Sequence, residues 1–351
     1  MNHKEKISYR DSIIFKDSKK IISKININNY SNKTILITGA NGLFGQYLVS
    51  TFTLANQKLN ANIKIITISK SGPNKFIKKY NKKNINLKID LEKKFTFSGK
   101  VDYIFHSAGY ARPKKWMSNK ISSININIFG TKKLLEIAKK NKAKFIYFSS
   151  VDIYGQVKKR DLPIKEVLFG NLDSSNKSNA YGEAKRMGEM LCSIYRFEKK
   201  VKTYLCRIFH TYGPGIKLND ERVIADFIRN AIKFNKIEIK DKGNAIKNFC
   251  YISDAIIMIL NIASDGKNFV YNIAGNKICS IYHLAKIIGK ICNAKVKKSL
   301  KQGNDEHIKK SNKIIYASTK KYSEEFGKII YENFNLSIRK IINWMINKKK
   351  Y

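Results

Sequence analysis

The chain has 351 residues, 43% of them hydrophobic, and its 69 lysines and arginines against 26 aspartates and glutamates give a formal net charge of +43. This length permits one large domain or two closely associated domains with a substantial buried core. No stretch approaches the ~20 apolar residues of a membrane span, and no CxxC pair signals a metal site or a disulfide framework, so these classes are excluded.

Residues 1–32 are polar and charged, and we expect them to form a helical or irregular N-terminal extension. They contain no apolar stretch long enough for a signal peptide, and the five cysteines are typical of reduced thiols, so we expect a cytoplasmic protein. The net charge attracts polyanions without specifying which ones. Because no basic run carries interleaved aromatic residues, we expect no specific nucleic-acid partner.

Strand and helix patterns alternate between residues 33 and 212. Short apolar or β-branched runs predict six strands, at 34–38, 63–69, 85–90, 101–108, 144–150 and 203–209. Helical patterns between them predict an α/β fold, a doubly wound parallel sheet of the Rossmann type that binds NAD(P). The pattern loosens over residues 213–351, which we expect to form mainly a smaller C-terminal α/β substrate-binding lobe over the carboxyl ends of the strands.

A glycine motif, Gly39-x-x-Gly42-x-x-Gly45, directly follows the first predicted strand and opens a helix. Glycines allow a tight turn and a close approach of backbone amides to a pyrophosphate, and the helix N-terminus stabilises its negative charge. The motif therefore predicts an NAD or NADP site. We expect cofactor contacts from Gly39, Asn41, Gly42, Leu43, Phe44, Gly45, Asp90, Leu91, Ser107, Ala108 and Gly109.

The residues that end the second predicted strand bear on the choice between NAD and NADP. An acidic residue there binds the ribose 2′-hydroxyl of NAD. This chain has Ser69, Lys70 and Ser71 instead. A lysine and hydroxyl groups suit a 2′-phosphate, so NADP stays open, although Lys70 is equally one of many surface lysines. Asp90, after the third strand, is either an acceptor for the adenine amino group or a plain strand-end carboxylate.

Tyr181 and Lys185 form a YxxxK motif on a predicted helix, where residues four apart share a face. We expect Lys185 to lower the pKa of Tyr181 by its charge and to bind the nicotinamide ribose. A tyrosinate near neutral pH is a competent general base for a sugar hydroxyl. Ser150, at the end of the fifth strand, could hydrogen-bond the same sugar oxygen, with Asp152 as a second acid–base group. The alternatives for Ser149 and Asp152 are a strand cap and a turn carboxylate.

Seven motifs occur in order: the glycine motif, HSAGYARP (106–113), NIFGT (127–131), SSVDIYG (149–155), YGEAK (181–185), RIFHTYGPG (207–215) and NFCYISD (248–254). Together, over about residues 33–345, the chain resembles the extended short-chain dehydrogenases/reductases that remodel nucleotide sugars, the NAD-dependent epimerase/dehydratase family. Within that family it is most similar to UDP-glucuronate decarboxylases and nucleotide-sugar 4,6-dehydratases of surface-polysaccharide pathways.

The resemblance implies a nucleotide-sugar enzyme that works through a 4-keto intermediate. Tyr181 would be the base at the sugar 4-hydroxyl, Lys185 its partner and Ser150 the hydrogen-bonding third member. Asp152 stands where dehydratases and decarboxylases carry a glutamate. NAD or NADP would be tightly bound and recycled, and Asn127 would be the structural or water-binding asparagine beside it.

The resemblance also implies residues for the nucleotide-diphosphate sugar. Lys247 falls where the family usually has a diphosphate-binding arginine, and Arg222 would approach the nucleotide. His210 stands where an asparagine is usual, and Arg112 is a fourth substrate-binding candidate. A homodimer is implied as well, through the helices that carry residues 127–140 and 181–191.

Three functions remain open from the sequence. The first is a dehydratase or decarboxylase of a dTDP- or UDP-sugar, a lyase that makes surface-glycan precursors. The second is a nucleotide-sugar 4-epimerase, an isomerase that needs only Ser150, Tyr181 and Lys185. The third, of another class, is a non-catalytic Rossmann protein that binds RNA or a membrane surface.

Overall fold

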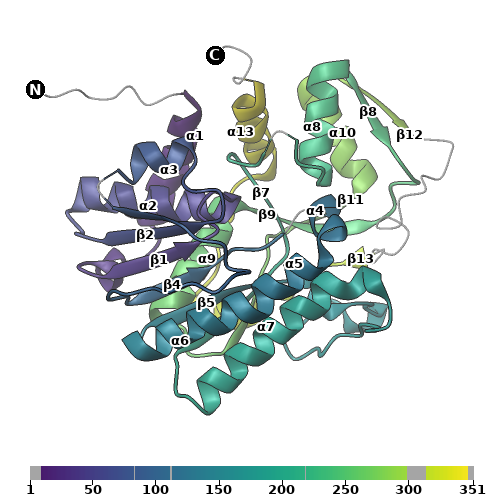
Figure 1. Ribbon diagram of the computed structural model, residues 1–351. Helices are drawn as coiled ribbons and strands as arrows, with labels where there is room; N and C mark the ends of the chain where they lie inside the picture. Colours follow the sequence, from purple (N-terminus) through teal and green to yellow (C-terminus); the bar gives the residue numbers. More distant parts are fainter. Residues whose placement is uncertain (1–8, 83, 111–112, 218, 299–313, 347–351) are drawn as a thin grey trace, which may run out of the picture.

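A seven-stranded sheet with the order β10-β6-β5-β4-β1-β2-β3 forms the centre of the computed structural model (Figure 1). The model describes residues 9–82, 84–110, 113–217, 219–298 and 314–346. All neighbouring strands of this sheet are parallel. The strands are β1 (Thr34–Thr38), β2 (Lys64–Ser69), β3 (Ile85–Lys88), β4 (Tyr103–His106), β5 (Lys144–Ser150), β6 (Thr203–Ile208) and β10 (Val270–Ile273).

Helices cover both faces of the sheet. Successive residues of each strand point to opposite faces, so apolar side chains on each face pack against a layer of helices. Ile35 and Ile37 of β1 pack in a core with α2 and α9, whereas Leu36 between them packs in a second core with α6 and α7. This confirms the predicted doubly wound fold. The helices are α2 (Leu43–Leu59), α3 (Lys75–Tyr80), α4 (Pro113–Ser118), α5 (Lys120–Asn125), the π-helix η2 (Ile126–Gly130), α6 (Thr131–Asn141), α7 (Ala180–Phe197) and α9 (Ile252–Asp265).

The six predicted strands are all present, and the seventh comes from a later part of the chain. β10 pairs with β6, so the region after residue 212 completes the edge of the Rossmann sheet. The same region contributes α9, which packs against α2. The two parts of the fold are therefore interleaved along the chain.

A smaller lobe holds the remaining strands (Figure 1). β9 pairs with β7, β11 and β13, and β8 pairs with β12. Short helices precede this lobe along the chain: η3 (Val151–Tyr154), η4 (Lys159–Asp161) and η5 (Lys177–Asn179). Its own elements are β7 (His210–Tyr212), α8 (Val223–Phe234), β8 (Lys236–Ile239), β9 (Ile246–Tyr251), β11 (Lys277–Ser280), α10 (Ile281–Cys292), β12 (Lys295–Lys298), β13 (Ile314–Ile315), α12 (Lys320–Phe326) and α13 (Phe334–Ile346).

The N-terminal segment packs onto the Rossmann part. It forms α1 (Tyr9–Ile22), which lies against α2 and α9, followed by η1 (Ile27–Tyr30). Ile14 and Ile21 are buried, because residues seven apart share a face of a helix. Because the segment is mostly polar, its composition did not reveal this apolar stripe.

A buried carboxylate ties the two ends of the described chain together. Asp17 of α1 is 1% exposed and accepts hydrogen bonds from the hydroxyls of Tyr47 at 2.9 Å and Tyr251 at 2.5 Å. Lys340 of α13 forms an ion pair with it at 2.9 Å. The carboxylate therefore connects α1, α2, β9 and α13. Among the described helices, none is both long and apolar enough to cross a membrane.

Candidate active site

The glycine motif forms a close-packed turn between β1 and α2. Gly39 has φ +68°, a conformation that favours glycine, and a Cβ there would lie 2.8 Å from the backbone of Ala108. A Cβ at Gly45 would lie 2.4 Å from the Cα of Ala40. The turn therefore packs Gly39 against the residues that follow β4, and α2 begins directly after it at Leu43, with a helix N-terminus that suits a pyrophosphate. These residues fit a dinucleotide cofactor.

The other predicted cofactor residues line or support the same edge of the sheet. Ser107 donates to the carbonyl oxygen of Thr38 at 2.7 Å, and the amide of Ala108 donates to the hydroxyl of Thr38 at 3.3 Å. Leu91 is buried against Gly130, and the ring of Phe44 packs edge-on against that of Phe148.

Asn127 is fully buried inside the fold. Its amide nitrogen donates to the carbonyl oxygen of Ser123 at 2.8 Å, and its oxygen accepts from the hydroxyl of Tyr147 at 2.8 Å. The bond from Tyr147 holds the π-helix η2 against β5, and the bond to Ser123 joins η2 to the preceding helix α5. The structure therefore supports the structural reading of Asn127.

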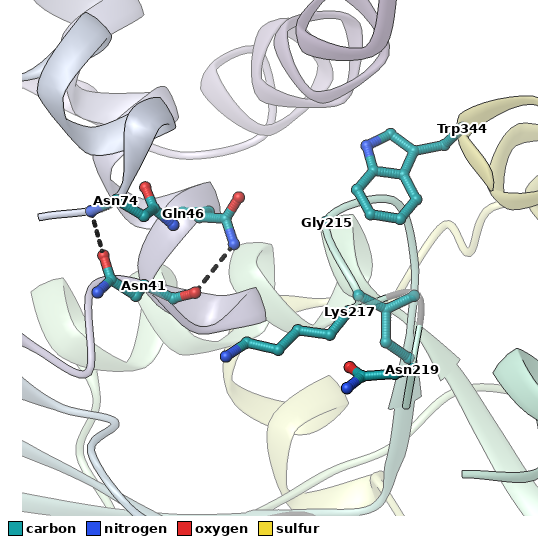
Figure 2. Close-up of a pocket in the computed structure, with 8 residues that line it drawn as sticks. Asn41, Gln46, Asn74, Gly215, Lys217, Asn219 and Trp344 are labelled. Carbon is teal, nitrogen blue, oxygen red and sulfur yellow. Dashed lines mark hydrogen bonds between the residues drawn. The ribbon is translucent and has the colours of Figure 1, made fainter. Parts of the chain in front are cut away.

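A cavity of about 540 Å³ lies beside the glycine motif (Figure 2). Asn41, Gln46 and Asn74 line one side, and Lys217 and Trp344 line the other. Only Asn41 was predicted as a site residue. The sequence did not indicate the others, because the opposite wall comes from the segment after β7 and from α13, far along the chain.

Tyr181 and Lys185 stand on α7 directly against the end of β5. A Cβ at residue 182 would lie 2.8 Å from the carbonyl oxygen of Asp152, so glycine at that position allows α7 to pack closely on η3. The close packing places Tyr181 beside Ser150, which hydrogen-bonds it. The predicted assembly of Ser150, Asp152 and Tyr181 is thus present.

Tyr181 is 8% exposed, and the ring of Trp116 stacks on it with centroids 5.8 Å apart. Burial raises the pKa of Tyr181, and the charge of Asp152 raises it further. The hydrogen bond between Tyr181 and Ser150 and the charge of Arg222 oppose this rise in the pKa. Lys185, which we expected to lower the pKa of Tyr181, is not among these causes, and its effect on that pKa stays a prediction.

Lys185 acts elsewhere in the site. Its ammonium donates to the carbonyl oxygen of Phe148 at 2.7 Å and lies 4.8 Å from the centre of the Tyr147 ring. Burial lowers the pKa of Lys185 to about 8, while the charge of Glu189 opposes that decrease. A Cβ at Gly109 would lie 3.8 Å from the ammonium, so Lys185 adjoins the predicted cofactor residues.

Ser150 ends β5 and caps η3. Its hydroxyl accepts from the amide of Asp152 at 3.2 Å and donates to the carboxylate of Asp152 at 3.0 Å. Asp152 is exposed, whereas Ser150 is buried. Ser149 instead donates to Glu189 at 2.6 Å, and Glu189 forms an ion pair with Arg207 at 2.8 Å. Ser149 is therefore part of a structural network, and Ser150 faces the site.

The predicted substrate residues approach these groups from the smaller lobe. Burial lowers the pKa of Lys247, on β9, to about 8, and the charge of Asp152 opposes that decrease. Arg222 forms an ion pair with Asp220 at 2.9 Å and acts electrostatically on Tyr181. Lys247 thus lies near Asp152, and Arg222 lies near Tyr181.

Of the other two substrate candidates, the structure describes only His210. His210 of β7 lies beside Phe249, with ring centroids 6.0 Å apart. Arg112 falls outside the described residues. Within the described part of the chain, no group of three histidine, cysteine, aspartate or glutamate residues could hold a metal ion.

Comparison with known proteins gives a consistent picture. The sequence model of the NAD dependent epimerase/dehydratase family matches residues 35–274. UDP-glucuronic acid decarboxylase 1 of Xenopus tropicalis is 27% identical over 256 residues, which are 73% of this chain and 59% of that protein. The chain thus spans less than two thirds of that relative's length.

Two solved structures share the fold. UDP-N-acetylglucosamine 4-epimerase from Methanobrevibacter ruminantium has a TM-score of 0.76 at 22% identity, covering 91% of this chain and 99% of that one. UDP-glucuronic acid 4-epimerase from Bacillus cereus, in complex with UDP-glucuronic acid and NAD, has a TM-score of 0.72 at 21% identity, covering 91% and 100%.

Proposed function

The chain belongs to the NAD-dependent epimerase/dehydratase family, and we propose that it modifies a nucleotide-diphosphate sugar through a 4-keto intermediate, as a dehydratase or a decarboxylase. The observation that carries this proposal is the grouping of Ser150, Asp152 and Tyr181 at the end of β5. The resemblance of the chain to UDP-glucuronic acid decarboxylases supports the substrate class. We infer a role in making surface-glycan precursors.

Tyr181 removes the proton of the sugar 4-hydroxyl, and Ser150 hydrogen-bonds the same oxygen. The residues of the glycine motif would hold NAD or NADP, which would supply the acceptor for the C4 hydride and the source for its return. Because burial raises the pKa of Tyr181, the phenol needs help to hold negative charge, and the Ser150 hydrogen bond and the Arg222 cation give that help. Lys185 is buried between Phe148 and Gly109, and it positions these two residues on the cofactor side of the site.

Asp152 acts after the ketone has formed. A 4-ketone acidifies the C5–H bond and turns a C5 carboxylate into a β-keto acid that loses carbon dioxide. The Asp152 carboxylate lies 3.0 Å from the Ser150 hydroxyl, so it stands next to the group that binds O4. It removes the C5 proton as water leaves from C6, or it positions a C5 carboxylate for decarboxylation. Lys247 supplies a positive charge near Asp152.

The test is mass spectrometry of the pure enzyme with a panel of UDP-, dTDP-, GDP- and CDP-sugars. Loss of one water identifies a dehydratase, and loss of carbon dioxide identifies a decarboxylase. An unchanged mass with a new chromatographic peak identifies a 4-epimerase instead. No change in any sugar of the panel, with cofactor bound, contradicts the proposal.

We also propose that the protein is a homodimer. Met187, Met190 and Ile194 of α7 are exposed and share one helix face by their spacing, and Ile121 and Phe129 are exposed on the adjoining α5 and η2. Exposed apolar residues grouped in this way are typical of an interface. Two copies of this helical face would form a four-helix bundle.

A further inference from the structure

The end of β5 bonds to three successive turns of α7, the helix that packs against it (Figure 1). Ser150 hydrogen-bonds Tyr181, and on the next turn Lys185 donates to a backbone carbonyl oxygen of the strand at 2.7 Å. One turn further, Glu189 accepts from the hydroxyl of Ser149 at 2.6 Å. The three helix residues are four apart and share one face of α7, so Glu189 belongs to the same row of contacts as Tyr181.

Glu189 also binds a buried arginine. Arg207 of β6 is the direct neighbour of Ser149 across the sheet, and it donates to the two carboxylate oxygens of Glu189 at 3.0 and 2.8 Å. Both side chains of this ion pair are 11% exposed. Burial acts to lower the pKa of Arg207, but the hydrogen bond and the charge of Glu189 outweigh it and raise that pKa. Arg207 is therefore charged, although the pair is largely withdrawn from water.

The arginine also reaches a second part of the site. One of its terminal nitrogens donates to the hydroxyl of Tyr154 at 3.1 Å, and the guanidinium lies 5.0 Å from the centre of the Tyr154 ring. Tyr154 is fully buried and ends η3, the short helix that carries Asp152. Its hydroxyl donates onward to Asn272 of β10 at 2.7 Å. The ion pair is thus linked both to the strand end that carries Ser150 and to the helix that carries Asp152.

Stability alone is a weak reason for this arrangement. A buried ion pair contributes little net stability, because the cost of removing two charges from water offsets most of their attraction. A buried network whose members are hydrogen-bonded does, however, hold the elements that it joins in a single arrangement. Here the joined elements are β5, β6, η3 and α7, and three of them carry the residues of the proposed chemistry.

We propose that the Glu189–Arg207 pair positions the reacting groups of the site through two arms. The first arm runs through Ser149 to the end of β5, whose last residue takes part in oxidation at C4. The second arm runs through Tyr154 to η3, whose Asp152 carboxylate acts in the later chemistry at C5. This inference rests on the proposed function, and it assigns one step of that function to each arm.

The test removes one hydroxyl from each arm. Glu189→Gln or Arg207→Met would leave a buried charge without its partner and would test folding rather than positioning. Ser149→Ala cuts the first arm and Tyr154→Phe cuts the second, while the ion pair stays intact. Arg207 also keeps its bond to the carbonyl oxygen of Glu166 at 2.8 Å in both variants. Circular dichroism and urea unfolding establish that each variant is folded.

Single-turnover reactions with the nucleotide sugar that the panel identifies separate the two steps, when quenched samples are analysed by mass spectrometry. Ser149→Ala should slow consumption of the substrate about ten-fold or more, because small misplacements of reacting groups are costly. Tyr154→Phe should leave the first oxidation unchanged, slow the loss of water or carbon dioxide about ten-fold or more, and let the 4-keto sugar accumulate. A general loss of packing would not divide the steps in this way.

Thr203→Val and Tyr204→Phe are the matched controls, toward the start of β6. The Thr203 hydroxyl donates to the carbonyl oxygen of Cys192 on α7 at 3.1 Å, and the Tyr204 hydroxyl donates to that of Gly266 at 2.9 Å. Both hydroxyls are buried and join elements of the same sheet, but neither belongs to the two arms. Both controls should keep the normal rates of the two steps.

Normal rates in both folded arm variants, or equal slowing of the two steps in each, would overturn the inference while the proposed function stands. A 4-epimerase activity would overturn the proposed function, and the rate of Ser149→Ala would still decide the first arm. An unaltered protein that changes no sugar of the panel would overturn both.

Discussion

The indole of Trp116 stacks on the phenol ring of Tyr181, with the two planes 23° apart. Trp116 comes from α4, which precedes the strand that carries Ser150. The indole covers one face of the phenol, and burial of Tyr181 is the first cause of its raised pKa. The proposed general base is therefore largely shielded from water, and its hydrogen bond with Ser150 is stronger there than in water.

Removal of the Tyr181 hydroxyl should abolish the chemistry and leave the fold intact. Tyr181→Phe should lower the turnover of the sugar substrate about 100-fold or more, the usual contribution of a positioned general base. Binding of the dinucleotide should persist. Tyr195→Phe is the control on the same helix, since the Tyr195 hydroxyl bonds to Glu136 and not to the site. Equal turnover by Tyr181→Phe and the unaltered enzyme would refute the assigned role.

Asp152 should separate the first step from the later ones. Asp152→Asn keeps the size of the side chain but removes its basicity, so C5 chemistry should fall about 100-fold or more while oxidation at C4 continues. Reduced dinucleotide, followed by absorbance, should accumulate with the 4-keto sugar. If this variant still releases water or carbon dioxide at the normal rate, Asp152 is not the second acid–base group.

His106 should make the protein less stable in acid. Burial lowers the pKa of His106 to about 3 from its ordinary 6.5, and its ring nitrogens bond to Thr38 and Thr131 at 2.8 and 3.0 Å. Between these two pKa values the unfolded chain binds a proton that the folded chain does not. Stability should therefore fall as the pH falls from 6.5 toward 3, by about 1.4 kcal/mol per pH unit for this one proton.

Urea unfolding at several pH values measures this dependence. His106→Asn should flatten the slope of stability against pH, whatever its effect on stability at neutral pH. His283→Asn, at an exposed histidine on α10, should leave the slope unaltered. An identical slope in His106→Asn would show that His106 does not govern the acid response.

Asp17 should contribute to stability through the buried carboxylate network. Asp17→Ala leaves Tyr47, Tyr251 and Lys340 without their shared acceptor, which should cost about 3 kcal/mol of unfolding free energy. Lys16→Ala changes the exposed neighbour on the same helix and should shift stability by less than ~0.5 kcal/mol. Similar unfolding midpoints for the two variants would contradict this role of Asp17.

A charge on the exposed apolar face of α7 should prevent self-association. Met190 is 56% exposed in the single chain, and Met190→Arg would place two like charges in the centre of the proposed four-helix bundle. Light scattering after gel filtration should report a dimer for the unaltered protein and a monomer for this variant. A monomeric unaltered protein would refute the homodimer.

The strands and the catalytic motif were predictable because their signals are local. A β-branched run such as Thr34–Thr38 specifies a buried strand by itself, and YxxxK specifies a helix face. The edge strand Val270–Ile273 was missed, because a short run among helices carries no sign of the strand it joins.

The electrostatics of the site were less predictable than its residues. The sign of the pKa shift at Tyr181 depends on burial in the folded protein, where Trp116 of α4 is one of the groups packed on its ring. Lys70 offered a cation for a phosphate, but its neutralisation by Asp90 and Glu92 follows from the pairing of β2 with β3. The sequence shows which residues are charged, but only the tertiary structure shows which residues they pair with.

The link between Asp17 and Lys340 has a consequence for biosynthesis. The ribosome synthesises α1 more than three hundred residues before α13, and strand β10 is also synthesised late. The nascent Rossmann half therefore emerges with an incomplete sheet edge and with Asp17 lacking its lysine partner. Final closure of the fold must wait until α13 has left the exit tunnel, so the Asp17–Lys340 ion pair forms late in folding.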